Sequence, residues 1–153
     1  MADIDQERQN HIDDLYAQFT PDKDSNLHND KIISNYTWAI FILEEAVTAF
    51  LMRADLAAIL TISTAIEATL REKLDKTELA TFRSMIEEAA LPSDMQDRLH
   101  MLRKYRNQWA HQKSLAKKTD IQTNLHQIED ELEHMAFFAL KCGFEIIYMD
   151  QPI

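Results

Sequence analysis

The chain has 153 residues, of which 46% are hydrophobic, and its formal net charge is −10. This length suits one domain with a hydrophobic core of its own. Glycine occurs once, at Gly143, which excludes the glycine-rich loops that cradle phosphates and disfavours folds rich in β-hairpins. Cys142 is the one cysteine and cannot form an internal disulfide. The polar, acidic start predicts no secretory signal, and no apolar run approaches the roughly 18 residues of a membrane span, so we expect a cytoplasmic protein without a membrane partner.

The first half of the chain predicts three helices separated by short breaks. Residues 3–19 form a polar helix that ends before Pro21, and residues 22–29 form a loop. Residues 30–74 contain neither glycine nor proline, but one helix of this length would be unusual, so we place a turn at residues 52–54 with Asp55 as the N-cap of the next helix. Apolar residues recur over 55–74 with the period of an amphipathic helix, and Glu67 falls inside this apolar arc.

The second half predicts three more helices. A short helix over 78–90 ends before Pro92, and Ser93 with Gln96 has the spacing of a capping box for a helix over about 94–111. The inward positions of that helix are apolar or aromatic: Met95, Leu99, Leu102, Tyr105 and Trp109. After a polar linker over 112–119, Asp120 can cap the last helix.

The last helix is apolar on nearly all sides. Steps of four and three residues form a seam for a partner helix, at Ile121, Leu125, Ile128, Leu132, Met135, Ala139, Cys142, Ile146 and Met149. The cover on its other faces comes either from a homodimer or from its own bundle, and the pattern fits both equally. The sum is an all-α, antiparallel bundle of about five to six helices in a single domain over 1–153, with its core at about 30–149 and residues 1–19 as an accessory helix.

The net charge hides an uneven distribution. The 21 residues over 98–118 carry seven Lys or Arg and no Asp or Glu, so this segment is +7 and the rest of the chain is −17. The overall charge argues against a nucleic-acid partner, whereas this segment has the sign that phosphate requires. A solvated helix face is the plainer interpretation of such a run.

Within this basic segment, Arg106, Asn107 and His111 form an Arg-x4-His motif. Leu102 and Arg103 lie shortly before it, and alanine stands immediately before the histidine. These residues resemble the motif of the HEPN family, and the segment over 65–71 resembles the family's helix with an acidic residue. Residues 82–91 look like the short connecting helix of a subgroup built around a domain of unknown function. The resemblance covers about residues 30–149.

The resemblance implies a dimer in which two such motifs meet at a cleft. Many HEPN proteins are metal-independent endoribonucleases in which the ribose 2′-hydroxyl attacks its own phosphate and leaves a 2′,3′-cyclic end. In this chain Arg106 would bind the phosphate, His111 would transfer a proton, Asn107 would orient either group, and Glu67 would hold the arginine. No cofactor and no metal are implied. The RNA-binding side chains would be Arg103, Lys104, Lys113, Lys117 and Lys118.

The family resemblance also suggests a setting for the protein. We expect a part in toxin–antitoxin or antiviral defence, with an antitoxin or regulatory protein as a further partner. In a subset of HEPN toxins a tyrosine two residues after the histidine is modified by a partner nucleotidyltransferase. Lys113 stands at that position here, so this form of neutralisation is unsupported.

Three alternatives stay open. Glu67 and Arg106 could be a buried ion pair that only fixes helix register. His111 lies about 140° from Arg106 on an ideal helix, so the partner subunit or a frayed helix end would have to bring the two side chains together. The competing function is that of a non-catalytic HEPN dimer that acts as a binding or regulatory module. A four-helix metal site is the remaining alternative, with Asp97, His100, Glu131 and His134 as two acid-x-x-His pairs and Glu44, Glu45 and Glu67 as further ligands.

Overall fold

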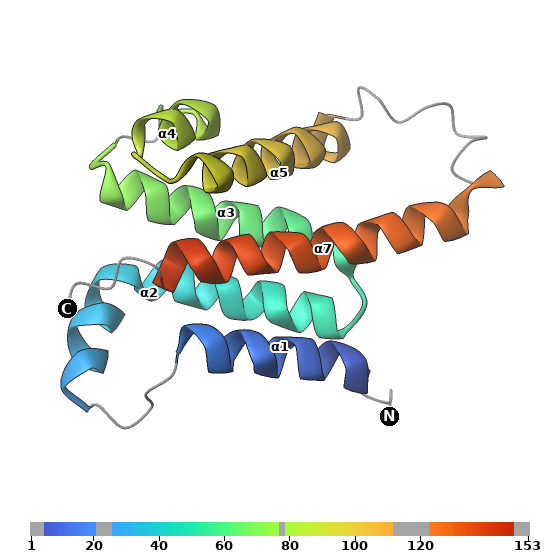
Figure 1. Ribbon diagram of the computed structural model, residues 1–153, viewed down its shortest axis with the longest axis horizontal. Helices are drawn as coiled ribbons and strands as arrows, with labels where there is room; N and C mark the ends of the chain where they lie inside the picture. Colours follow the sequence, from blue (N-terminus) through green and yellow to red (C-terminus); the bar gives the residue numbers. More distant parts are fainter. Residues whose placement is uncertain (1–4, 21–25, 77–78, 112–122, 149–153) are drawn as a thin grey trace.

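The computed structural model describes residues 5–20, 26–76, 79–111 and 123–148, and gives the backbone alone for residues 26–37 and 111. The described residues form six helices and no strand, as the all-α prediction requires (Figure 1). The helices are α1 (Gln6–Phe19), α2 (Asn26–Leu51), α3 (Asp55–Lys73), α4 (Phe82–Glu88), α5 (Ser93–His111) and α7 (Leu125–Tyr148). Every described helix is too short or too polar to cross a bilayer.

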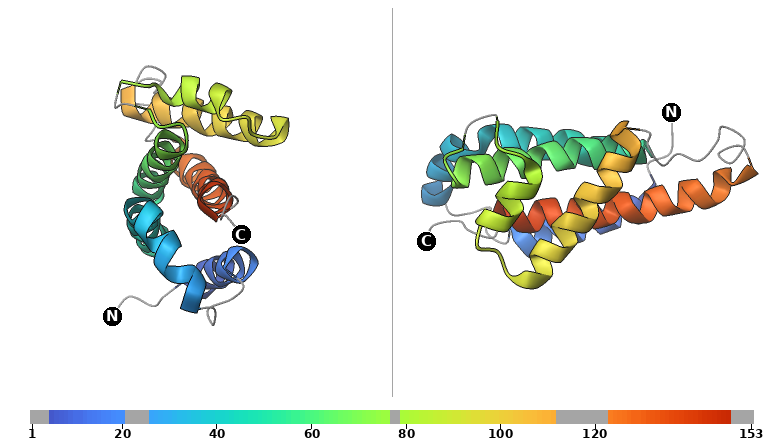
Figure 2. Two further views of the ribbon diagram at one scale, coloured as in Figure 1. Left: turned by 90° about the vertical axis from the view of Figure 1, so that its left-hand side faces the viewer. Right: turned by 90° about the horizontal axis from the view of Figure 1, so that it is seen from above.

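Helix α3 lies at the centre of the bundle. It packs against α2, to which a tight turn joins it, and against α7, which runs along both helices (Figure 1). On one side α4 and α5 form a separate layer over α3, with α5 crossing it obliquely, and on the opposite side α1 lies against α7 and α2 (Figure 2). The layer of α4 and α5 carries the Arg-x4-His segment, so α3 is the floor on which that segment rests.

The helix boundaries follow the predicted stops with four corrections, three of which concern the starts of α2, α3 and α5. Helix α2 begins at Asn26, so the predicted loop over 22–29 is helical from there on. Asp55 is the first residue of α3 and makes no capping bond, because its carboxylate binds the side chain of Arg8 instead. Helix α5 begins at Ser93, and Gln96 donates its side-chain amide to the carbonyl of Leu91 at 3.2 Å, so the predicted capping box does not form.

The turn before α3 and the start of α4 complete the comparison with the predicted boundaries. The turn at residues 52–54 is present, and Arg53 takes the left-handed conformation there with φ of 59°. Helix α4 is shorter than predicted because Thr81 caps it, its hydroxyl accepting from the Ser84 amide at 3.1 Å. Asp120, the predicted cap of the last helix, lies outside the described residues.

The core is built chiefly from α3 and α7. Helix α3 buries Ile59, Ile62, Ile66 and Leu70, and the C-terminal half of α7 buries eight residues between Ala136 and Ile147, among them Cys142. Gly143 lets the two helices approach, since a Cβ added there would lie 2.5 Å from Cγ1 of Ile62. The single glycine of the chain therefore serves close helix packing.

The cover of α7 bears on the dimer prediction. Helices α1, α2, α3 and α5 of the same chain all contact α7, so its apolar girth does not itself require a partner subunit. The start of the predicted seam is different, because Leu125 is 47% exposed. Homodimerisation stays a prediction.

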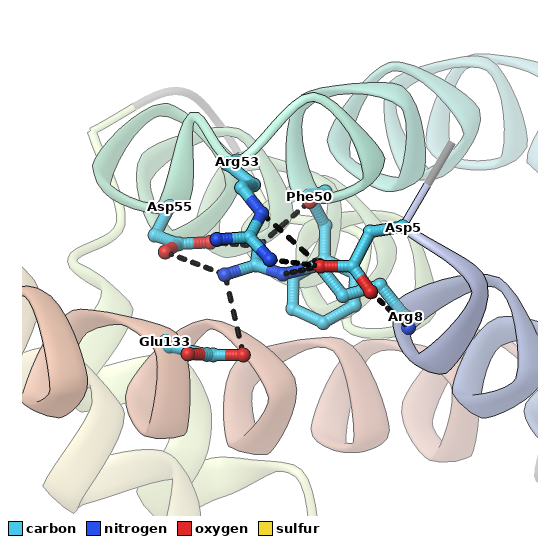
Figure 3. A network of polar contacts seen from close by, with 6 residues as sticks. All are labelled: Asp5, Arg8, Phe50, Arg53, Asp55 and Glu133. Carbon is cyan, nitrogen blue, oxygen red and sulfur yellow. Dashed lines mark hydrogen bonds and ion pairs between the residues drawn. The ribbon is translucent and has the colours of Figure 1, made fainter. Parts of the chain in front are cut away.

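A buried cation fastens α1 to the rest of the bundle. Arg8 is 3% exposed, and its guanidinium donates to the Phe50 carbonyl at 2.7 Å and to both carboxylate oxygens of Asp55 (Figure 3). A further ion pair joins it to Glu133 of α7 at 3.4 Å, and the Phe50 ring lies 4.5 Å from its centre. Hydrogen-bond acceptors gather in the corner where α2 ends and α3 begins, and Arg8 provides the donors for them.

Candidate functional site

The structure brings two predicted site residues together. Arg106 of α5 and Glu67 of α3 form an ion pair with Nη1 and Oε1 2.9 Å apart, and their side chains are 24% and 20% exposed. Oε1 of Glu67 nevertheless has no hydrogen-bond partner within the described residues. The contact therefore has the distance of an ion pair but not the angles of a hydrogen bond. The sequence placed Glu67 in the apolar arc of its helix, and Glu67 lies beneath α5 because this arc packs toward the bundle.

An aromatic ring holds the other side of the arginine. The Arg106 guanidinium lies 5.5 Å from the ring centre of Phe82, the first residue of α4, and Phe82 is itself buried. Such a contact favours the charged guanidinium and fixes its plane. Arg106 is therefore positioned by three helices: its own, α3 and α4.

Arg71 is a further member of this cluster that the sequence analysis missed. One turn after Glu67 on α3, it places Nη2 3.9 Å from the second oxygen of that carboxylate and donates to the Ala80 carbonyl at 3.4 Å. The spacing of four residues from Glu67 was the available clue, since such pairs share a helix face. Arg71, Glu67 and Arg106 together bear a formal charge of +1.

Two donors of this cluster lack hydrogen-bond partners. Nε of Arg71 and Nε of Arg106 are buried and have no hydrogen-bond partner within the described residues. A buried donor without an acceptor costs free energy, so two guanidinium groups on one carboxylate favour the arrival of another anion. A phosphate oxygen is an acceptor of the required charge and shape.

The rest of the motif is less completely described. Asn107 is half-buried on α5, and His111 lies in the last turn of the same helix, where the backbone alone is described. Lys113, Lys117 and Lys118 lie outside the described residues. The geometry therefore joins Glu67 to Arg106, and the approach of His111 to Arg106 stays a prediction.

Tyr105 and Trp109, both predicted to face inward, are half-buried rather than fully buried. Burial raises the pKa of the Tyr105 hydroxyl to about 12, so this group stays protonated at neutral pH. Its neighbours are Trp109 and, on α7, Glu131, and it adds no negative charge on that side of α5.

The basic segment is less positive than its sequence implies. Arg98 donates to both carboxylate oxygens of Glu145 on α7, at 2.7 and 3.2 Å, and also pairs with Asp94. These bonds raise the pKa of Arg98, with its hydrogen bond to the Glu145 carboxylate as the largest cause. The first cation of the segment thus fastens α5 to α7 and contributes little to an external field.

Arg103 and Lys104, both predicted to bind RNA, line a pocket of about 670 Å³ between α4 and α5. Arg103 is half-buried and Lys104 is exposed. Arg83 of α4 lines the same pocket. Arg103 and Lys104 lie within one turn of Arg106 on α5, and Arg83 directly follows Phe82 on α4, so these cations extend the positive surface beyond Arg106.

The four-helix metal site is not formed. The described residues contain no group of three or more His, Cys, Asp or Glu side chains that could hold a metal ion. Glu67 is engaged by the two arginines, and Glu131 and His134 are exposed on α7, apart from the pocket that Asp97 and His100 line. The pairs with ligand-like spacing therefore form no common site within the described residues.

Comparison of the chain with protein-family models, curated proteins and solved structures found no match. The resemblance to the HEPN family consequently stays a prediction from the residues of the motif.

Proposed function

We propose that this protein is a metal-independent endoribonuclease of the HEPN type. The observation that carries the proposal is the ion pair between Glu67 and Arg106, because the resemblance expects the acidic residue of one helix to hold the arginine of the Arg-x4-His motif. The pair belongs to a cluster of net positive charge in which two buried arginine Nε atoms lack partners, and its Arg106 lies on the same helix as His111.

In the proposed reaction the 2′-hydroxyl oxygen of the substrate attacks the adjacent phosphorus, and the bond from phosphorus to the 5′ oxygen of the next nucleotide breaks. The products are a 2′,3′-cyclic phosphate and a 5′-hydroxyl. Arg106, with Arg71 behind it, stabilises the charge that gathers on the phosphate oxygens. His111 transfers a proton to the leaving oxygen or takes one from the attacking hydroxyl, and Asn107 orients the reacting groups.

The proposal includes the assembly and the setting. A homodimer brings two motifs to one cleft and supplies the second set of cations, with Arg103, Lys104, Lys113, Lys117 and Lys118 holding the strand. The protein acts in the cytoplasm without a cofactor, in a toxin–antitoxin or antiviral system whose antitoxin covers the basic cleft. Sedimentation equilibrium tests the dimer, which a monomer at all concentrations contradicts.

The decisive experiment is cleavage of single-stranded RNA in the presence of EDTA. We expect the unmodified protein to cut the RNA and to leave cyclic phosphate ends. Arg106→Ala and His111→Ala should each reduce the rate by about 100-fold or more, because general acid–base and electrostatic contributions have that size. Arg53→Ala is the matched control, an exposed arginine far from the motif. Equal cleavage by the Arg106→Ala/His111→Ala double variant, or no cleavage by the unmodified protein, refutes the proposal.

A second candidate is a non-catalytic HEPN dimer that binds RNA or a regulatory protein. The observation that favours it is the engagement of Arg106, held between Glu67 and the Phe82 ring as a structural cation would be. The same experiment separates the two candidates, since this one predicts RNA binding without cleavage.

A further inference from the structure

The outward face of α2 is apolar and has no cover within the described residues. Helix α2 packs against α3, α7 and α1 on its other sides (Figure 2). Trp38 and Phe41 project from the uncovered face with 76% and 53% of their surface exposed, and their rings meet edge to face with centres 6.3 Å apart. Met52, just past the end of α2 and about three helix turns after Phe41, is 69% exposed. Large exposed apolar side chains that lie together are typical of a surface that binds another protein.

The charge on this face is negative. Glu44 and Glu45 are exposed one turn after Phe41, and residues 38–52 contain no Lys or Arg. Neither carboxylate forms an ion pair with another described residue. Two unpaired acids beside exposed aromatic rings attract a cation and repel the phosphates of RNA or of an anionic membrane. The face therefore differs in its chemistry from the basic surface of α5.

Aromatic groups of two other helices lie near Glu44. Tyr16 of α1 and Tyr148 of α7 pack against Phe144, with ring centres 4.9 and 5.9 Å from its own. Burial and then the charge of Glu44 raise the pKa of the Tyr16 hydroxyl, and burial, Tyr16 and Glu44 together raise the pKa of Tyr148 to about 12. Both phenols are neutral at pH 7 and leave the negative charge of Glu44 unbalanced. A carboxylate with aromatic rings nearby is an environment that favours a guanidinium or an ammonium group.

We infer that this face of α2 docks an amphipathic helix of a partner protein that carries Lys or Arg beside its apolar stripe. The cations of the partner pair with Glu44 and Glu45, and its apolar side chains cover Trp38 and Phe41. The exposed side chains follow a helix at spacings of three and four residues, which suits a second helix alongside. A second copy of this chain fits less well, because a two-fold dimer through this face would bring the acids of both copies together. The inference is independent of RNA cleavage, since none of these residues belongs to the Arg106 cluster.

Calorimetric titration of the full-length protein with a synthetic amphipathic helix of leucine and lysine, about four turns long, tests the inference. Glu44→Lys/Glu45→Lys and Trp38→Ser should each weaken binding about tenfold or more. Glu7→Lys/Glu72→Lys is the matched control, because it makes the same change of net charge at exposed acids on α1 and α3 and should weaken binding less than about twofold. All substituted side chains are exposed, so the variants should fold, and Glu44→Gln/Glu45→Gln serves where a reversed charge lowers the melting temperature.

Two further measurements complete the test. In the Trp109→Phe protein Trp38 is the single tryptophan, and peptide binding should shift its fluorescence to the blue as the ring is buried. The same peptide with glutamate in place of lysine should not bind. Failure of the leucine–lysine peptide to bind, binding of the glutamate peptide, or an equal loss in the acid variant and its control overturns the inference. A change from dimer to monomer in Trp38→Ser overturns it too, because the occupant is then a second copy.

Discussion

Replacement of Arg8 by methionine should destabilise the protein severely. Methionine keeps much of the side-chain volume but removes the donors to the Phe50 carbonyl and to Asp55, whose side chain is only 10% exposed (Figure 3). Breaking a buried ion pair by removing one partner costs about 3–5 kcal/mol, because the remaining charge is left without compensation. Since domains of this kind unfold with about 5–15 kcal/mol, the loss is a large part of the total.

Urea denaturation followed by circular dichroism measures this loss, and the melting temperature should fall by about 6–20 °C. Arg53→Met is the matched control. Its side chain is 70% exposed and pairs with Asp5, so the cost should be below about 1 kcal/mol. In the Arg8→Met/Asp55→Asn double variant, part of the stability should return because the orphaned charge is gone. A loss below about 1 kcal/mol for Arg8→Met, or no recovery in the double variant, would refute this account of the corner.

Three further predictions concern the core and the N-terminal cap. Burial raises the pKa of the Cys142 thiol to about 11, so a thiol reagent at mildly alkaline pH should react far more slowly with the native protein than with the urea-unfolded chain, and equal rates would contradict its burial. Gly143→Ala should lower the free energy of unfolding, because overpacking against Ile62 costs about 1–3 kcal/mol while the higher helix propensity of alanine returns about 1 kcal/mol. The loss should be smaller in an Ile62→Ala background. An identical loss in both backgrounds would show that the clash with Ile62 is not its cause. The Arg8 backbone amide and the Arg53 side chain lower the pKa of Asp5 below its usual 3.8, so the stabilisation from Asp5 is present above that pH and is lost as the pH falls further; urea midpoints of Asp5→Asn should depend less on pH between about 4 and 2, and an unchanged dependence would exclude this role.

Local rules predicted the helices well where a local residue decides. Helix α1 ends at Phe19 just before Pro21, because proline disfavours helix in the residue before it. The turn predicted at residues 52–54 also separates α2 from α3, although no side chain caps α3. Asp55 shows the limit of such rules. Its spacing suits a cap, but Arg8, 47 positions away, takes its carboxylate.

Pairing over long distances in sequence also explains what was missed at the candidate site. The charge of the segment over 98–118 gave no indication that Glu145, 47 positions later, neutralises Arg98. The pair of Glu67 with Arg106 was predicted from the family resemblance and also, without it, as a buried ion pair that fixes helix register. Periodicity alone places each residue on a helix and does not show that the two residues meet. Arg71 was overlooked although its spacing from Glu67 was visible.

The last helix was ambiguous for a different reason. Apolar residues on all sides of a helix indicate that it must be buried, but they do not indicate whether its own chain or a second chain buries it. In the structure α1, α2, α3 and α5 provide the cover over the C-terminal half of α7. Whether the exposed start of α7, with Leu125 at its surface, meets a second copy depends on assembly and not on the fold of one chain.

The contact of Arg8 with the end of α2 changes what a minimal domain would be. Sequence resemblance places the core after residue 30 and makes the first helix an accessory that a truncated protein could lose. Yet the carbonyl of Phe50 and the carboxylate of Asp55 receive their donors from α1, so a chain that starts at residue 26 would carry two unsatisfied acceptors at its central turn. Limited proteolysis that removes α1 should therefore release the turn between α2 and α3 as well, so that α1 and this central turn would lose their structure in one step.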